Sequence, residues 1–399
     1  MTNYFTYGDK ELCCGCRGCE QICPKKCISM NMDKEGFIYP IVEKENCIDC
    51  KLCEKVCPIK GGGYKNKEVL NSPEAYGGYN KNKNVLEKST SGGAFTAIIN
   101  SFFSEDIIVY GAAFNEDLVV KHFCAKNIKE VEKLRGSKYV QSDVQDSYSK
   151  IRAFLRDGKK VLFSGTPCQV AGLKSFLQVD YENLFCVDIV CHGVPSPKVF
   201  ELYKKHLEEK NKMKLLEINF RDKSQKGWHT SFVSHKYSNG KIKKEIHCDD
   251  DFIIGFYKDY YVRPICHKCP FTKTKRVSDI TIADFWGVEQ INPELNNMRG
   301  TSLILLNTKK AVDIKLNLIN FLELETINLE KAIEFNPQLK HPTNPNENRS
   351  KFMNDLSNGY SFNELKKKYL KKRILIKRII SRTIDKKTKY KIKKILRLN

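Results

Sequence analysis

The sequence predicts an α+β protein of three parts, and three observations predict this division. Ten of the seventeen cysteines precede residue 58, so the first part is a cysteine-rich head at residues 1–62. Residues 74–340 alternate short apolar runs with amphipathic stretches, a pattern typical of an α/β domain. The last part, at residues 345–399, is basic and is expected to be helical.

The composition is that of a folded protein. Of the 399 residues, 41% are hydrophobic and 11% aromatic, which is enough to bury a core and excludes a wholly disordered chain. No stretch approaches about 18 uncharged apolar residues, so no membrane-spanning helix is expected. Residues Met1–Lys10 lack the apolar core of a signal peptide, so we expect a cytoplasmic protein. In that reducing compartment, seventeen cysteines argue for metal binding rather than disulfides.

The head contains one cysteine pattern twice. Each copy reads C-x2-C-x2-C-x3-C-P, the first ending at Cys23-Pro24 and the second at Cys57-Pro58. This is the spacing of bacterial ferredoxins with two 4Fe-4S clusters, in which the fourth cysteine of each run binds the other cluster. The alternative is a zinc site, which commonly uses two C-x2-C pairs. The predicted ligands are Cys13, Cys16, Cys19 and Cys57 for cluster 1, and Cys23, Cys47, Cys50 and Cys53 for cluster 2.

The other features of the head are secondary to these runs. Residues Phe37–Val42 are expected to form a strand between the two cysteine loops. Cys14 and Cys27 lie outside both runs and are expected to be packing or spare thiols, with Cys14 able to replace Cys13 if that ligand were lost. Gly61–Gly63 is typical of a flexible exit from the head, which we expect to fold with its iron independently.

The middle is expected to contain a buried sheet followed by a β-rich subdomain. Apolar runs predict strands, and proline-led amphipathic stretches predict the helices after them. The pattern changes to strands at residues 218–247, with a hairpin turn at Ser238-Asn239-Gly240. The predicted strands are Ile107–Ala113, Val161–Ser164 and Leu184–Val190, and the predicted helices are Pro167–Leu177 and Pro197–Glu209.

Four further cysteines lie where such a fold binds ligands. Cys168 and Cys191 each follow a predicted strand, at the sheet edge where open α/β domains hold their ligands. Cys266 and Cys269 form a C-x2-C-P turn. We therefore expect Cys168, Cys191, Cys266 and Cys269 to hold a third 4Fe-4S cluster. The alternative is that the first two are small buried residues and the last two form a separate zinc or redox pair.

Other motifs of the middle are less specific. There is no G-x-G-x-x-G and no P-loop, which disfavours a Rossmann nicotinamide site and a P-loop ATPase. Ser89–Gly93 precedes an apolar helix at Ala94–Phe103, where free N–H groups suit a phosphate, although most such loops are only N-caps. Residues 135–142 offer a cation, an aromatic ring and hydroxyls, and residues 279–287 place an acid and an indole at a strand end. His192 is either a proton relay or a hydrogen-bonded loop histidine.

Taken in order, these motifs resemble those of a known family. They are Ser91-Gly92-Gly93, Gly136–Tyr139, Gly165–Gln169, Cys191–Ser196, Arg221–Lys223 with Gly227-Trp228, Cys266-x2-Cys269-Pro270, Asp284–Gly287 and Gly300–Ser302. With the doubled cysteine run, they resemble the coenzyme F420 hydrogenase/dehydrogenase beta-subunit family, in its bacterial form with a fused N-terminal dicluster ferredoxin domain. The resemblance covers roughly residues 1–325. One departure is Ala283, where relatives commonly carry glycine.

The resemblance implies an FAD-binding α/β domain with its own 4Fe-4S cluster beside the flavin, and hence an iron–sulfur flavoprotein oxidoreductase. Relatives reduce a deazaflavin or a chlorophyll derivative, or pass electrons to a partner, and many bacterial members occur beside cell-surface polysaccharide genes. A redox partner protein or a small-molecule donor or acceptor is expected. Lys138, which could stabilise an anionic reduced flavin, and His192 are weak candidates for a catalytic role. The expected flavin contacts are Ser91, Gly92, Gly93, Lys138, Tyr139, Gly165, Thr166, Asp284 and Trp286.

Two other classes of function stay open. One is an electron-transfer subunit without a substrate site of its own, and the other is an iron–sulfur protein for nucleic-acid binding or assembly. Of the net charge of +22, residues 365–399 carry +15 and the rest of the chain carries +7. Three clusters with a charge of −2 each would reduce that +7 to about +1. A nearly neutral body disfavours nucleic-acid binding.

The C-terminal tail has the highest charge density of the chain. Residues 365–399 hold sixteen Lys and Arg against one acid, Asp385. Isoleucines and leucines among the lysines predict a basic amphipathic helix or a pair of helices. Three interpretations stay open: a solvated surface helix, an arm that binds nucleic acid, and a seat on an anionic membrane surface. The last would place the protein at the inner face of the cell membrane.

Overall fold

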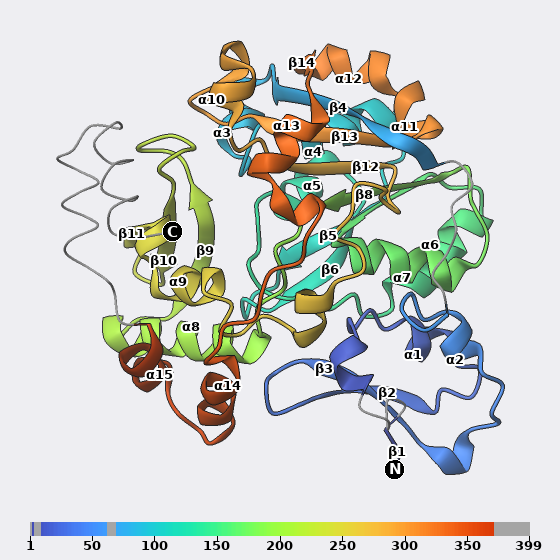
Figure 1. Ribbon diagram of the computed structural model, residues 1–399, viewed down its shortest axis with the longest axis vertical. Coiled ribbons are helices and arrows are strands. Elements are labelled where there is room, and N and C mark those ends of the chain that lie inside the picture. The colour runs from blue at the N-terminus through green and yellow to red at the C-terminus, as the bar shows by residue number, and fades with distance from the viewer. Residues whose placement is uncertain (1, 4–8, 62–68, 371–399) are drawn as a thin grey trace.

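A large mixed sheet forms the centre of the structure, a computed structural model that describes residues 2–3, 9–61 and 69–370 (Figure 1). The strand order is β14-β4-β13-β12-β8-β7-β5-β6. Strands β5, β7, β8 and β12 run parallel to one another, and the other neighbours pair antiparallel. The strands are β4 (Val69–Asn80), β5 (Val109–Phe114), β6 (Val120–Ala125), β7 (Val161–Gly165), β8 (Leu184–Ile189), β12 (Ile280–Asp284), β13 (Ser302–Thr308) and β14 (Leu322–Thr326).

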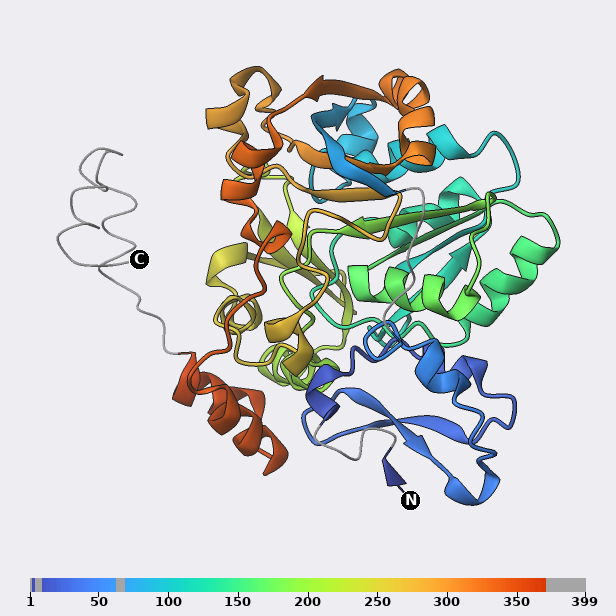
Figure 2. The same cartoon turned by 45° about the vertical axis from the view of Figure 1, so that its right-hand side comes forward.

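Helices cover both faces of this sheet (Figure 2). Successive strand residues point to opposite faces, so Leu162 packs with α4, α5, α11 and α12, whereas Phe163 packs with α6 and α7. The strands and helices predicted for this region are present, and their ends differ from the predicted ones by at most two residues. The helices are α3 (Lys83–Glu87), α4 (Ala94–Phe102), α5 (Ile128–Leu134), α6 (Ser147–Arg156), α7 (Pro167–Leu177), α10 (Val288–Ile291), α11 (Lys309–Asp313), α12 (Lys315–Phe321) and α13 (Leu329–Phe335).

The carboxyl ends of the parallel strands lie at one edge of the sheet. β7 ends at Gly165, β8 at Ile189 and β12 at Asp284. Antiparallel pairing places Ser302 opposite both Asp284 and Gly78, so the end of β4 lies at the same edge. Most of the candidate residues belong to loops that leave this edge, as in other open α/β folds.

The predicted β-rich subdomain follows α8 (Pro197–Asn211). Its sheet has the order β11-β10-β9, and Gly240, with φ of 80°, lies in the hairpin turn between β10 and β11. A buried polar network joins this sheet to the neighbouring helices, because the Tyr203 hydroxyl lies 2.9 Å from His235 Nε2 and donates to Asp250 Oδ2 at 2.5 Å. Asp250 also caps α9 (Asp251–Tyr257). The strands are β9 (Leu215–Asp222), β10 (Phe232–Tyr237) and β11 (Ile242–Ile246).

The head repeats its backbone conformation as well as its cysteines. Gly15 and Asp49, which precede the second cysteine of each run, have φ of 68° and 50°. Arg17 and Lys51, which follow that cysteine, have φ of 59° and 58°. Each run then enters a short helix. The helices are α1 (Gly18–Ile22) and α2 (Leu52–Lys55), and the strands are β1 (Thr2–Asn3), β2 (Ile28–Met32) and β3 (Ile38–Val42), in the order β1-β3-β2.

The head packs against residues 69–370, here called the body, and shares a core with them. Phe37 and Tyr39 are buried in the same cluster as Phe200 of α8. Arg17 Nε donates to the Asp143 carboxylate at 2.5 Å, so an ion pair also joins the two parts. Independent folding of the head stays a prediction, and the shared core argues against it.

The C-terminal helices α14 (Arg349–Ser357) and α15 (Phe362–Tyr369) belong to the body. Phe362 and Leu365 are buried in the core that also contains Phe37. The amphipathic helix and the membrane seat predicted for the tail concern mainly residues 371–399, which lie outside the described residues. Within the described ranges, no helix combines the length and the apolar character that crossing a membrane requires.

Replacing Phe37 by alanine should lower the thermal stability of the iron-loaded protein, because its ring is fully buried where the head meets the body. The loss of a buried phenylalanine side chain costs about 3–5 kcal/mol. The apparent melting temperature, measured anaerobically, reports this loss. Ile48→Ala is the control, since Ile48 is 58% exposed. An F37A protein that melts with the wild type would contradict the shared core.

Replacing Asp250 by asparagine should change how stability depends on pH. Burial raises the pKa of Asp250 to about 7, so the folded protein keeps a proton that the unfolded chain releases near pH 4. Relative to D250N, the wild type should lose stability as the pH rises from about 4 to about 7, by at most about 1.4 kcal/mol per pH unit. Denaturant titrations of both proteins across this window measure the difference. A constant difference would show that Asp250 does not titrate there.

Candidate functional site

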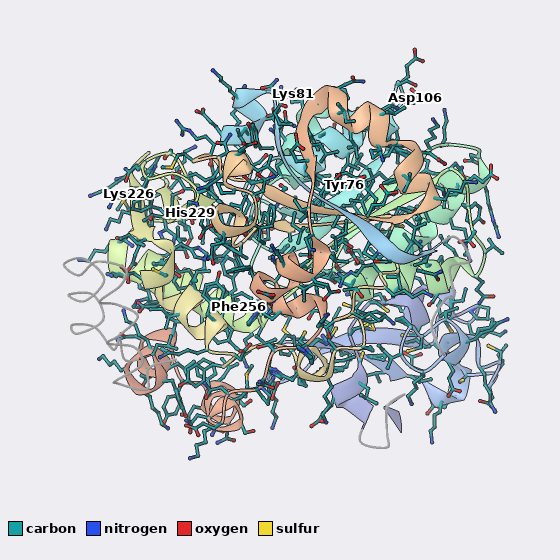
Figure 3. The ribbon with its side chains drawn as sticks, turned by 45° about the horizontal axis from the view of Figure 1, so that its top comes forward. Tyr76, Lys81, Asp106, Lys226, His229 and Phe256 are labelled. Carbon is teal, nitrogen blue, oxygen red and sulfur yellow. The ribbon has the colours of Figure 1, made fainter. Side chains whose placement is uncertain are left out.

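The thiols predicted for cluster 1 lie together although they come from both cysteine runs. Cys13, Cys16 and Cys19 belong to the loop and helix at α1, and Cys57 follows α2. Burial raises the pKa of Cys19 well above its ordinary value, and the charges of Cys13 and Cys57 raise it further. Burial likewise raises the pKa of Cys57, to which Cys13 contributes. In Figure 3, sulfur atoms gather on the side of the head that faces the body.

The thiols predicted for cluster 2 lie nearer the surface of the head. Cys47 and Cys50 are exposed, and Cys23 is half-buried. Cys27, which the sequence presents as a packing or spare thiol, has its Sγ 3.4 Å from that of Cys23. Burial raises the pKa of Cys27, and the neighbouring Cys23 and Cys47 raise it further. Cys27 therefore packs against two predicted ligands of this set.

The third predicted set converges at the carboxyl edge of the large sheet. Cys168 lies in the first turn of α7, Cys191 follows β8, and Cys266 and Cys269 lie on and after the 3-10 turn Pro264–Lys268. Burial raises the pKa of Cys191 well above its ordinary value, and Cys266, Cys168 and Cys269 add to this effect in that order. Three separate segments of the chain thus bring four thiols to one place.

A glycine allows this convergence. Gly193 has φ of 149°, a conformation that favours glycine, and it lies two residues after Cys191. A Cβ atom at this position would lie 2.5 Å from Val262 Cγ1 and 3.2 Å from Cys266 Cβ. A side chain at Gly193 would therefore push the Cys191 loop away from the turn that holds Cys266.

The chemistry of the third set fits an iron–sulfur cluster. Burial raises the pKa of Cys266 to about 12 and that of Cys269 to about 11, with Cys168 adding to both, so these thiols need cations in order to ionise. Backbone N–H groups of Gly193 and Val194 point to Cys191 and Cys266, and such N–H···S bonds tune cluster potentials. Among the described residues, no three His, Cys, Asp or Glu side chains are arranged to hold a single metal ion.

Cys14 lies between the first and third sets, although the sequence presents it as a spare thiol. It is buried, and its thiol is hydrogen-bonded with Cys16 of the first set and Cys168 of the third. The hydrogen bond with Cys16 raises the pKa of Cys14, that with Cys168 lowers it, and burial raises it, with a large net increase. The third set is therefore a direct neighbour of the first.

Two of the predicted flavin loops lie side by side at the same sheet edge. Ser91 Oγ donates to Thr301 O at 2.7 Å, and Gly92 N donates to Ser302 Oγ at 3.0 Å. A Cβ atom on Gly92 would lie 2.5 Å from Gly78 O, so only glycine fits there. The second loop, which contains Lys138 and Tyr139, joins the first through a hydrogen bond from Ser137 N to Thr90 Oγ1 at 2.9 Å. Gly93, with φ of 80°, begins α4.

A buried arginine with free donors lies next to these loops. Arg221 Nη1 donates to Asp284 Oδ2 at 3.3 Å and to the Tyr139 hydroxyl at 3.4 Å. Arg221 Nε and Nη2 are buried without a partner among the described residues. Burial alone lowers the pKa of Arg221, but Asp284 raises it above its ordinary value, so the group stays charged. Trp228 Nε1 donates to the other carboxylate oxygen, Asp284 Oδ1, at 2.8 Å. The Trp228 and Trp286 rings stack with their centres 5.0 Å apart.

Two lysines near this site donate to backbone carbonyls. Lys138 Nζ donates to Leu134 O and Arg135 O at the end of α5, at 2.9 and 2.8 Å, so this predicted flavin contact caps a helix. Lys223 Nζ donates to Ser91 O at 2.8 Å and fixes the loop that begins α4. Burial lowers the pKa of each lysine to about 7. Sequence reasoning missed Lys223 and Arg221 as site residues, although both belong to a quoted motif.

The remaining predicted residues lie beside the third cysteine set. Gly165 ends β7, and Thr166 Oγ1 lies 3.1 Å from Cys168 Sγ. His192 Nε2 lies 3.0 Å from Asp259 Oδ1, as a hydrogen-bonded loop histidine would. Two surface hollows of about 400 and 630 Å³ lie beside α14, away from all these residues. Their position gives them no link to the cysteines.

A C266A/C269A protein should retain two-thirds of the iron of the wild type, because it lacks only the ligands of the third cluster. Iron counting and low-temperature electron paramagnetic resonance on anaerobically reconstituted protein measure this. Cys248→Ala is the matched control, since Cys248 is exposed and belongs to none of the three sets. Full iron content in the double variant would contradict the existence of a third cluster.

Two family models match the part of the chain that contains these motifs. The family model of the N-terminal part of coenzyme F420 hydrogenase/dehydrogenase beta subunits matches residues 75–147, and that of the C-terminal part matches residues 158–332. Among solved structures, a chain of the F420-reducing NiFe hydrogenase complex from Methanosarcina barkeri is 17% identical, with a TM-score of 0.44, over 71% of this chain and 99% of that chain. No curated protein is significantly similar to this chain. The two adjacent family matches show that the chain belongs to the coenzyme F420 hydrogenase/dehydrogenase beta-subunit family, whose members are redox proteins.

Proposed function

We propose that this chain is an iron–sulfur flavoprotein oxidoreductase that passes electrons between FAD and three 4Fe-4S clusters. The convergence of Cys168, Cys191, Cys266 and Cys269 carries this proposal, since four half-buried thiols from three segments have no need to meet for packing alone. The proposed parts are a ferredoxin head at residues 1–62, an FAD-binding domain at residues 74–340 and a basic tail at residues 345–399. The link to cell-surface polysaccharide synthesis rests on the resemblance of the motifs alone.

The flavin is proposed to bind at the edge formed by the ends of β4 and β12. The free donors of Arg221 are the main support, because a buried guanidinium with two unpaired nitrogens suits a ligand with carbonyl or anionic acceptors. The Ser91–Gly93 loop offers the start of α4, and the Trp286 ring, which is 37% exposed, offers an apolar surface. A bound flavin would supply two-electron chemistry that can be divided into single-electron steps.

Arg221 would act on the flavin through its charge and its geometry. Asp284 and Tyr139 accept hydrogen bonds from Nη1, and this leaves Nε and Nη2 for the ligand. A fixed positive charge beside a flavin favours its anionic reduced form. Lys138 was expected in this role, but its ammonium is held by the carbonyls of α5, and Arg221 is the better candidate.

An electron-transfer subunit without a substrate site is the second candidate. The exposure of Cys47 and Cys50 favours it, because a cluster at the surface can exchange electrons with a partner protein. The two candidate functions differ in whether the protein binds a flavin. The visible spectrum of anaerobically reconstituted protein, together with counts of iron and flavin, separates them. Three clusters with one flavin support the oxidoreductase, whereas three clusters without flavin support the carrier.

Replacing Arg221 by methionine should reduce the flavin content at least severalfold without changing the iron content, because the ligand loses its charged donors. Flavin released by denaturation and iron per chain are measured on the same sample. Arg299→Met is the matched control, since the Arg299 side chain is 45% exposed and pairs with Glu87. A fully flavinated R221M protein with a wild-type flavin spectrum would contradict the proposed flavin position.

A further inference from the structure

Arg263 is a fully buried cation where the head meets the body. Its side chain has no exposed surface. Nε donates to Cys13 O at 2.7 Å, Nη1 to Gln141 Oε1 at 3.0 Å, and Nη2 to Ile38 O at 2.8 Å. Its guanidinium carbon lies 4.4 Å from the centre of the Tyr39 ring. All three nitrogens are therefore hydrogen-bonded, and both head and body contribute acceptors.

These contacts satisfy the donors of Arg263 but not its charge. Its three acceptors are neutral, and no Asp or Glu among the described residues forms a hydrogen bond or an ion pair with it. Arg276, another buried arginine, differs, because its Nη2 lies 3.2 Å from the buried Asp188 carboxylate. A buried charge without a counter-charge is strongly destabilising, so Arg263 requires an anion that its hydrogen-bond partners do not supply.

The groups that offset this charge are mainly cysteines, and the turn of the third set is bonded to Arg263 itself, because Cys266 N donates to Arg263 O at 2.9 Å. Burial alone lowers the pKa of Arg263, and Cys13, Tyr39, Cys14 and Cys266 then raise it above its ordinary value. Cys13 belongs to the set of cluster 1 and Cys266 to that of cluster 3. One fully buried cation therefore acts on both sets, and charges interact strongly in a buried environment.

The same loop brings the two sets into contact. Cys14 is hydrogen-bonded with Cys16 of the first set and Cys168 of the third. Gln141, the acceptor of Arg263 Nη1, donates its Nε2 to Cys14 O at 3.1 Å. Of the two cluster sites proposed in the head, that of cluster 1 thus lies nearer the third cysteine set.

We propose that Arg263 is the shared counter-ion of clusters 1 and 3 and raises the reduction potentials of both. The inference rests on the proposed function, because it requires the clusters. An electron makes a cluster more negative, so a fixed buried cation stabilises the reduced form. Cluster 2 lies at exposed Cys47 and Cys50, where solvent screens a distant charge. Arg263 therefore also favours passage of electrons between body and head through cluster 1.

The test is a redox titration of full-length, anaerobically reconstituted protein, followed by electron paramagnetic resonance. R263Q should lower the midpoint potentials of clusters 1 and 3 by at least about 59 mV, which equals a tenfold change in a one-electron equilibrium, and leave cluster 2 unchanged. R263K keeps the charge and loses the planar fork, so its potentials should stay near those of the wild type even if it melts earlier. Variants that each lack one cluster assign the signals.

Lys268→Gln is the matched control, because Lys268 lies between Cys266 and Cys269 but its side chain is 68% exposed and pairs with Glu11. K268Q should leave all three potentials unchanged. Unchanged potentials of clusters 1 and 3 in R263Q, or an equal fall of all three, would overturn the inference.

If R263Q does not bind its clusters, the iron content of R263Q and R263K is compared instead of the potentials. Loss of iron in R263Q with full iron in R263K supports the counter-ion, because lysine keeps the positive charge at this position and glutamine does not. Loss of iron in both variants, or a fall of about 59 mV or more in iron-loaded R263K, overturns it and leaves Arg263 as a structural anchor. A wild type without three clusters would instead contradict the proposed function.

Discussion

Parallel pairing of β7 with β8 is the constraint on which the rest of the site depends. Gly165 pairs with Asp188, so the two strands end side by side. Cys168 and Cys191 follow these ends and leave the sheet as neighbours. A slip of one residue would exchange the faces of a strand, and the buried side chains on both faces prevent it. The C-x2-C turn has then only to reach this edge, which it does beside Gly193.

The elements of the fold could be predicted because their signals are local. α7 begins at Pro167 after Thr166, whose side chain and that of Gln169 form a capping box, and these residues stand next to one another in the sequence. The buried strands are short apolar runs, and the cysteine runs have fixed spacing. The same spacing predicts which thiols meet, because it reflects the shape of a cluster and not the fold around it.

The residues that could not be predicted act between distant segments. Arg263 reaches the carbonyl of Cys13, which lies 250 residues earlier in the chain. Cys14 looks like a spare thiol until its loop is placed against α7. Lys138 stands in a motif and was expected at the flavin, yet its Nζ reaches the nearest helix end instead. Nothing in a local pattern states which carbonyls a lysine will find, and the same holds for the free donors of Arg221.

The repeated backbone of the head has a consequence for the way in which the head folds. Gly15 and Asp49 have matching φ, as do Arg17 and Lys51, so the two halves are copies in conformation as well as in cysteines. On the predicted ligand sets, each half gives three thiols to one cluster and its fourth to the other. A single half could complete no cluster by itself. On these predicted sets, binding of the clusters would couple the folding of one half to that of the other, since neither half supplies four ligands alone.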